Sequence, residues 1–333
     1  MTPRALLSVL YNASKGIDVV TAAHDLGIDA MLDAGPVSLR RICEATGTKP
    51  NRMYKLLDCL ESMGLVARSQ RSEERLDAQY QSTAPLVPAF EAVLGPSSIE
   101  RDRDRYDWRS IHGRLPAVLR GEFAIESFAW PPQTPEQVAG FEASMAAGCT
   151  PIVESFRRAR EKVFDGAARW LDVGGGDGTL ALALLSELPQ LSVDILNLPQ
   201  TRELVLARAR AAGVQTRMGF VGMDFFADEL PSGYDVVSFV RVLHDWDESR
   251  ARALLTKGAR AVAPGGHIVV CEEFRTPERL AVQFFWTYFL MGVDACESRL
   301  REVEFYTRVL EELGFEDVRV LHGPFDLVIA RKP

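Results

Sequence analysis

Apolar runs alternate with helical patterns throughout the second half of the chain. The runs that fit buried strands occupy these places: Arg169–Val173, Val193–Leu198, Gln215–Phe220, Tyr234–Val240, His267–Cys271, Val318–Leu321 and Leu327–Ala330. Amphipathic helical spacing fills most of the intervals, which is typical of a doubly wound α/β sheet. The last two runs are joined only by the turn His322-Gly-Pro324, whereas a parallel connection needs a dozen or more residues. We therefore predict a seven-stranded, Rossmann-like sheet that ends in an antiparallel hairpin.

Residues 1–90 are predicted to be mainly helical, with little strand. Two helical patterns, Leu39–Ala45 and Asn51–Met63, are separated by a turn at Lys49-Pro50, as in a helix-turn-helix. The segment Leu65–Tyr80 is predicted to form a small wing. The pattern thus indicates a winged-helix-like domain, and such domains often bind DNA.

The charges of the second helix disfavour DNA binding. Its acidic side chains balance its basic ones, so that it has no basic face: Arg52, Lys55, Asp58 and Glu61. The whole chain has a formal net charge of -8, whereas contact with nucleic-acid phosphates normally needs a basic surface. We expect this domain to serve dimerisation, with no nucleic-acid partner. A ligand-responsive DNA-binding regulator is the alternative.

The middle of the chain separates this domain from the predicted sheet. Within it, Pro135–Val163 resumes an amphipathic helical pattern that places Phe141 and Met145 on one side. Taken alone, these two side chains are more often core residues than ligand contacts. We expect three segments along the chain: a helical domain at 1–90, a helical linker at 91–165 and the sheet domain at 166–333.

Size and composition indicate an ordinary globular protein. With 333 residues, of which 47% are hydrophobic, the chain can bury a large core and form two domains. The cysteines are scattered, without metal-ligand spacing, which predicts reduced thiols and no metal site: Cys43, Cys59, Cys149, Cys271 and Cys296. Because neither a membrane-spanning run nor a signal peptide is evident, we expect a cytoplasmic protein.

A glycine-dense turn follows the first predicted strand of the sheet. An acid and three glycines stand in it at alternate positions: Asp172, Gly174, Gly176 and Gly178. Glycines between a strand and a helix let the backbone approach a ligand closely, and the helix directs its first N–H groups toward that ligand. The dinucleotide fingerprint would need a glycine where Thr179 stands and an acid near Asn197. The motif therefore predicts a nucleotide-type cofactor and disfavours a nicotinamide.

Five blocks in the chain together resemble one enzyme family. They are Asp172–Gly178, Asn197–Pro199, Met223–Phe226, Arg241–Trp246 and Pro264–Glu272. In this order they are similar to the S-adenosylmethionine-dependent O-methyltransferases of the caffeic acid type and of bacterial antibiotic pathways, and the resemblance covers most of the chain. It implies a methyltransferase sheet, a homodimer formed through a helical N-terminus such as Leu6–Leu32, and S-adenosylmethionine as methyl donor, with S-adenosylhomocysteine as product.

The resemblance also implies how the cofactor is held. Gly174 would lie against the methionine part, and Asp224 and Phe225 would hold the adenine. The family usually has an aspartate at the position of Asn197, which accepts hydrogen bonds from both ribose hydroxyls, whereas an amide must also offer a donor. At Arg241 the family has a basic residue in contact with the cofactor. The expected cofactor contacts are Asp172, Gly174, Gly176, Gly178, Asn197, Asp224, Phe225 and Arg241.

For catalysis the resemblance implies that His244 is the general base. A phenol, with a pKa of about 10, is a poor nucleophile at neutral pH, so the protein must remove its proton. A neutral imidazole suits this task, and a carboxylate behind it fixes its tautomer. Glu272 matches the family's first such carboxylate. Glu297 is an approximate replacement for the second, because the usual Gly-Gly-x-Glu-Arg-Thr pattern is lost around it.

An apolar slot for a flat ring is expected beside the base. The aromatic run Phe284–Phe289 matches the helix that covers the acceptor pocket in the family. The expected acceptor contacts are Phe141, Met145, Asp245, Trp246, Phe285, Phe289 and Met291. We therefore predict methyl transfer to a small aromatic substrate, most simply to a phenolic hydroxyl in secondary metabolism.

Several alternatives stay open at this point. The altered segment Cys296–Leu300 is compatible with transfer to carbon or nitrogen, and Asn197 with a relative that has lost methyl transfer. Asp245 and Glu248 also fit a reciprocal helix cap, with His244 as an ordinary histidine at the end of a strand.

Overall fold

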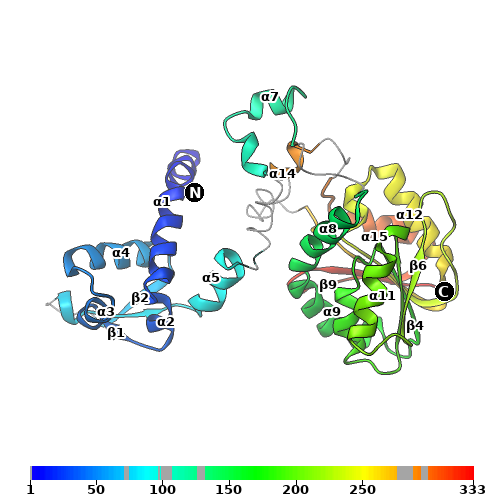
Figure 1. The fold of residues 1–333 in the computed structure, drawn as a ribbon, viewed down its shortest axis with the longest axis horizontal. Coiled ribbons are helices and arrows are strands. Elements are labelled where there is room, and N and C mark those ends of the chain that lie inside the picture. The colour runs from blue at the N-terminus through cyan, green and yellow to red at the C-terminus, as the bar shows by residue number, and fades with distance from the viewer. Residues whose placement is uncertain are drawn as a thin grey trace. The chain divides into compact units, whose positions relative to one another are not determined.

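The chain forms two compact units, Met1–Arg101 and Asp102–Pro333. The computed structural model describes residues 2–70, 75–96, 98, 107–125, 132–275, 288–293 and 299–333 (Figure 1). Within these ranges no helix is both long and apolar enough to cross a bilayer. The expected segment boundaries after residues 90 and 165, and the cytoplasmic location, stay predictions.

The N-terminal unit combines helices with a small antiparallel sheet. Its helices are α1 (Pro3–Asp25), α2 (Ile28–Asp33), α3 (Leu39–Thr46), α4 (Pro50–Ser62) and α5 (Leu86–Leu94). Its strands pair in the order β1-β3-β2, and a 3-10 turn precedes β3: β1 (Val37–Ser38), β2 (Val66–Gln70), η1 (Arg75–Asp77) and β3 (Gln79–Ser82). The helices α3 and α4 and the strand pair β2–β3 lie where the sequence predicts two helices and a wing.

Local capping and an apolar face explain α3 and α4. The Ser38 hydroxyl accepts a hydrogen bond from the Arg41 N–H at 3.2 Å and begins α3. Gly64, at φ 75°, follows α4 in the left-handed conformation that glycine adopts easily. Leu57 and Leu60 of α4 are fully buried in the core of this unit, so the helix packs its apolar side inward.

The second unit contains the predicted seven-stranded sheet. Its strands are β4 (Arg169–Val173), β5 (Ser192–Asn197), β6 (Met218–Gly222), β7 (Tyr234–Val240), β8 (Val262–Cys271), β9 (Glu316–Leu321) and β10 (Leu327–Arg331). Their order is β6-β5-β4-β7-β8-β10-β9, parallel from β6 to β8, with β10 antiparallel to both neighbours. The α/β class and the terminal hairpin are thereby confirmed.

Two strands begin three or more residues away from their predicted starts. The strand expected from Gln215 begins only at Met218, because the N–H groups of Arg217 and Met218 donate to the Val214 carbonyl at 2.8 and 2.9 Å in a tight turn. The strand expected from His267 begins already at Val262, where it pairs with Tyr234 across an irregularity in the register. Both changes lie at the amino ends of their strands.

Helices cover both faces of the sheet (Figure 1). One face packs on α9 (Thr150–Val163), α10 (Thr179–Leu185) and α11 (Arg202–Ala211), and the other on α12 (Glu248–Ala261) and α15 (Val303–Glu312). Trp170 contributes to the first core and its neighbour Leu171 to the second, so the strand is apolar on both sides. The remaining described elements are η3 (Trp108–Ile111), α7 (Leu115–Leu119), α8 (Pro135–Ala147), η4 (Pro199–Thr201), η5 (Leu243–Asp245) and α14 (Tyr288–Met291).

Candidate active site

A pocket of about 250 Å³ lies at the carboxyl ends of β4, β5 and β7. Helix α8 and the turn after β6 complete its walls. The predicted site residues that line it are Phe141, Met145, Asp172, Gly174, Gly176, Asn197, Asp224, Phe225, Arg241, Asp245 and Trp246. Ligands of open α/β sheets bind at this edge. The fold thus brings most of the predicted cofactor contacts into one cavity.

The glycine loop forms a wall that side chains would obstruct. Gly174 has φ 71°, and a Cβ on it would lie 2.6 Å from a methyl group of Val242. A Cβ on Gly175 would lie 2.6 Å from the Asp172 carboxylate. Gly178 has a different place. It caps α10 and is not part of the pocket lining, and a Cβ on it would collide with the Met218 side chain. Its expected cofactor contact stays a prediction.

Asp172 places a deeply buried carboxylate at the end of β4. It is 1% exposed, and its Oδ1 accepts a hydrogen bond from the Ser238 hydroxyl at 2.6 Å. Ser238 in turn accepts one from Trp170 Nε1 at 2.8 Å. Burial raises the pKa of Asp172 to about 6, against the smaller opposing effect of Ser238. A buried carboxylate with so little compensation favours a cationic ligand.

Asn197, at the end of β5, is engaged by the protein itself. Its Nδ2 donates to Glu142 Oε1 at 3.0 Å and to the Gly176 carbonyl at 3.3 Å, and its Oδ1 accepts from the Leu198 N–H at 2.8 Å. Glu142, from α8, also lines the pocket. Glu142 is not among the residues that the sequence predicts for the site, although it is the neighbour of Phe141.

An aromatic group stands at the β6 side of the pocket. Phe225, Phe226 and Trp246 meet edge to face, with ring centroids 4.6 to 6.0 Å apart. Asp224 Oδ1 accepts from the Phe226 N–H at 2.8 Å and fixes the turn that carries these rings. The site therefore offers a flat apolar surface beside a carboxylate. That Asp224 and Phe225 hold an adenine stays a prediction.

Arg241 follows β7 in an unusual backbone conformation. Its φ of 54° is rare for a residue with a side chain. Its N–H donates to the Cys271 carbonyl at 2.8 Å, and its guanidinium donates to the Met145 carbonyl in the pocket wall. Backbone strain of this kind is concentrated at functional sites, where surrounding contacts hold it in place.

His244 and Glu272 form a buried pair behind this wall. His244 Nδ1 is hydrogen-bonded to Glu272 Oε2, and Glu272 Oε1 accepts from the N–H groups of Val242 and Leu243 at 3.0 and 2.7 Å. Burial alone would lower the pKa of His244, but the carboxylates of Glu272 and Asp245 outweigh it and raise the pKa to about 9. Asp245 Oδ1 lies 3.4 Å from His244 Nε2. In the described residues the pocket lining includes Asp245 and Trp246 but not His244.

Arg301 holds the segment that carries His244. It donates to the carbonyls of Leu243, at 3.0 Å, and of Trp246. Asp247 Oδ1 accepts from the Arg250 N–H at 2.8 Å and caps α12. The alternative cap by Asp245 and Glu248 is therefore wrong, because Glu248 is already the first helical residue. Asp245 lines the pocket.

Of the remaining predicted acceptor contacts, the structure describes the side chain of Met291 alone. Phe285 and the predicted second carboxylate, Glu297, lie outside the described residues, and only the backbone of Phe289 is described. Met291 packs in a separate apolar cluster with Ile111 and Val293. The acceptor side of the site therefore stays a prediction.

Comparison with known proteins identifies the family. Residues 112–316 match the family model described as O-methyltransferase domain, and residues 10–85 match the O-methyltransferase dimerisation domain. The mitomycin biosynthesis 6-O-methyltransferase of Streptomyces lavendulae is 28% identical over 321 residues, 94% of this chain and 90% of that protein. The bacteriochlorophyllide d C-20 methyltransferase of Chlorobaculum tepidum is 27% identical over 318 residues, 94% of this chain and 92% of that protein.

A solved structure gives the same fold. The S-adenosylmethionine-dependent methyltransferase SibL, in its apo form, superposes with a TM-score of 0.73 at 24% identity, over 98% of this chain and 99% of that one. The family match extends over most of the chain and includes the glycine loop, Arg241, His244 and Glu272. The chain therefore belongs to the S-adenosylmethionine-dependent O-methyltransferase family.

Proposed function

We propose that this protein methylates the phenolic hydroxyl of a small aromatic molecule. The observation that carries the proposal is one loop after β7, in which Arg241 and Asp245 line the glycine-walled pocket and His244 pairs with Glu272. Bound S-adenosylmethionine would supply an electrophilic methyl group on a sulfonium ion. The protein would supply position, exclusion of water and removal of the acceptor proton.

The residues present fit this donor. Asp172 offers a buried carboxylate to its cationic part, and the glycine loop admits a ligand close to the backbone. Phe225 and Trp246 offer flat surfaces to a purine, beside the carboxylate of Asp224. Arg241 presents a guanidinium to a ligand carboxylate. The charges and the shape of the pocket thus match both the methionine part and the adenine of S-adenosylmethionine.

His244 would act as general base through Nε2. Its Nδ1 is bound to Glu272, which fixes the tautomer and stabilises the imidazolium after proton transfer. With a pKa of about 9, only about one imidazole in a hundred is neutral at pH 7. The base form therefore increases with pH, and catalysis should increase with it up to about pH 9.

Transfer of a labelled methyl group to a panel of phenols tests this proposal, with His244→Gln as the variant. Glutamine can still donate to Glu272, so the fold is kept while the base is lost. We expect kcat to fall by about 10²- to 10⁴-fold and binding of S-adenosylhomocysteine to stay unchanged. If the protein bound S-adenosylhomocysteine but methylated none of the acceptors, the result would favour the alternative that this chain has lost methyl transfer.

Methylation of carbon or nitrogen is the second candidate. One observation favours it, since the name of the Chlorobaculum tepidum relative specifies a carbon position, C-20. A neutral amine needs less help from a base than a phenol does. Full activity of His244→Gln on an amine acceptor, with none on phenols, would therefore support this candidate.

We also propose a homodimer formed through the N-terminal unit. This unit matches the dimerisation domain, and α1 carries exposed apolar side chains that a monomer would leave in water, at 85% exposure for Tyr11. The others are Leu6, Leu7, Val9, Leu10 and Ile17. Sedimentation of the wild type and of Leu7→Glu tests this, and we expect a dimer that the charge weakens.

A further inference from the structure

The corner of the pocket between α8 and the end of β5 contains a carboxylate–amide pair. Glu142 is 4% exposed, and its Oε1 accepts the hydrogen bond from Asn197 Nδ2. The two Asn197 N–H groups are used by Glu142 and Gly176, and its Oδ1 already accepts from Leu198. The amide therefore holds the carboxylate and has little left for a ligand.

The second oxygen of Glu142 is in the opposite situation. In the part of the chain that the structure describes, Glu142 Oε2 makes no hydrogen bond. It lies 3.0 Å from the position of a Cβ on Gly176, directly beside the glycine loop. Burial raises the pKa of Glu142 to about 7, aided by Asp177 and opposed by Asn197 and Arg241. Oε2 is not one of the fully enclosed side-chain atoms that lack a partner among the described residues, so it opens to the pocket, where a ligand hydroxyl can donate to it.

The strand order indicates which part of the methyl donor would lie next to Glu142. Strand β5 lies between β4, whose loop carries Gly174, and β6, which is followed by Asp224 and Phe225. If these two ends hold the methionine part and the adenine, the end of β5 faces the ribose between them. The ribose is also the part of the molecule with neighbouring hydroxyl donors.

We propose that Glu142 accepts hydrogen bonds from the ribose hydroxyls of the methyl donor, and that Asn197 positions it. This inference rests on the proposed function. The acid that the family resemblance places at position 197 is thereby moved to α8. An aspartate at 197 would put two carboxylates about 3.0 Å apart, and their repulsion would force one to stay protonated. Asparagine is the partner that this geometry requires.

Calorimetric titration with S-adenosylhomocysteine and its 2′,3′-dideoxy analogue tests the inference. We expect Glu142→Gln to weaken S-adenosylhomocysteine binding by about 10- to 100-fold, as for loss of a charged hydrogen-bond acceptor. The wild type should discriminate against the analogue by a similar factor, and the variant should discriminate little. Glu136→Gln, an exposed carboxylate on the same helix, is the control and should bind as the wild type does.

Returning the acid to position 197 gives a second test that does not depend on loss of function. In the Glu142→Gln background, Asn197→Asp should recover affinity and discrimination. Equal weakening of both ligands by Glu142→Gln would mean a structural role and overturn the inference, as would wild-type behaviour of that variant or failure of the rescue. Failure of the wild type to bind S-adenosylhomocysteine at all would refute the proposed function itself.

Discussion

Glu142 and Glu272 are both buried beside the same site, but their hydrogen bonds differ. Glu272 has both oxygens engaged by the protein, two backbone N–H groups on one and His244 on the other. Glu142 has one oxygen engaged by the Asn197 amide and one without a partner in the described residues. A carboxylate that the protein satisfies fixes the protein's own geometry. One that is only half satisfied at a pocket wall is prepared for a ligand.

The surroundings of Glu272 and of Glu142, here called the His244 corner and the Glu142 corner, also differ in the charge that they stabilise. The carboxylates of Glu272 and Asp245 raise the pKa of His244 to about 9 and so favour a cation. At Glu142, burial raises the pKa of the acid to about 7, whereas the hydrogen bond from Asn197 and the charge of Arg241 lower the pKa and so favour the carboxylate. The first corner is therefore suited to hold a proton, and the second to exchange hydrogen bonds with a ligand.

The largest expected effect comes from Glu272→Gln. The amide would donate to His244 Nδ1 and leave the proton on Nε2, the tautomer that cannot act as base. We expect kcat to fall by about 10³-fold or more, with the Kd of S-adenosylhomocysteine within about twofold of the wild type. Parallel measurement of Glu142→Gln should show the reverse, a change in Kd. If Glu272→Gln weakened the ligand and kept kcat, the two corners would have exchanged roles.

The fold was predictable because its strands are buried on both faces. The run Tyr234–Val240 is apolar at five of its seven positions, and the sequence identifies it with the observed bounds. The late start of β6 was not predictable, because the turn at Val214 depends on backbone hydrogen bonds that composition does not reveal. Local patterns thus predicted the elements better than their ends.

The site was predictable where its residues are neighbours in sequence. Asp172 and the glycines form one motif, and Arg241 and His244 form another. Glu142 was missed because its partner, Asn197, is 55 positions away, and only the packing of α8 against the end of β5 brings them together. In a helical pattern, a glutamate beside Phe141 is indistinguishable from a solvated one. Contacts between distant segments carry this part of the chemistry.

A smaller effect is expected from Asp245→Asn, which tests how far the Asp245 carboxylate raises the pKa of His244. Loss of this carboxylate, 3.4 Å from Nε2, removes one of the charges that raise the pKa of His244. Because the base is active when deprotonated, the rise of kcat/KM with pH should move to lower pH by up to about one unit. Profiles measured with one phenol exclude a change in the acceptor's own pKa. An unmoved profile would show that another group titrates.

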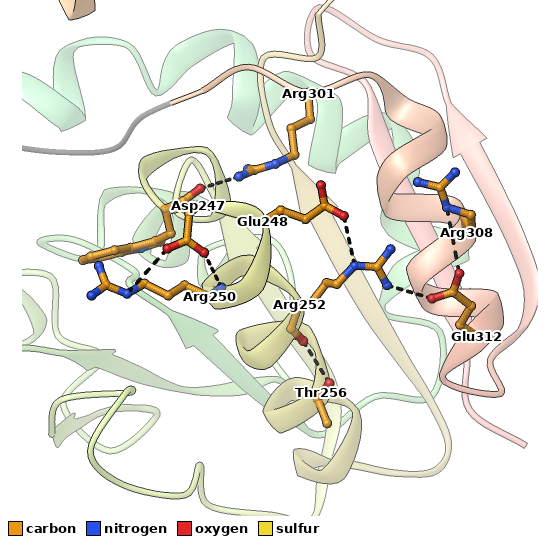
Figure 2. Close-up of polar contacts among 9 residues, drawn as sticks. Asp247, Glu248, Arg250, Arg252, Thr256, Arg301, Arg308 and Glu312 are labelled. Carbon is orange, nitrogen blue, oxygen red and sulfur yellow. Dashed lines mark hydrogen bonds and ion pairs between the residues drawn. The ribbon is translucent and has the colours of Figure 1, made fainter.

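The smallest effect is expected at exposed carboxylates, which provide the contrast to both buried ones. Arg252 bridges α12 and α15 by pairing with Glu248, at 3.3 Å, and Glu312, at 2.7 Å (Figure 2). Both acids are more than half exposed, and such pairs contribute little because water already solvates their charges. We expect Arg252→Gln to lower the free energy of unfolding by about 0.5 kcal/mol, measured by denaturant titration, and to leave ligand affinity unchanged. A loss of several kcal/mol would mean that the packing of α12 against α15 depends on surface charge rather than on the apolar core that the two helices share.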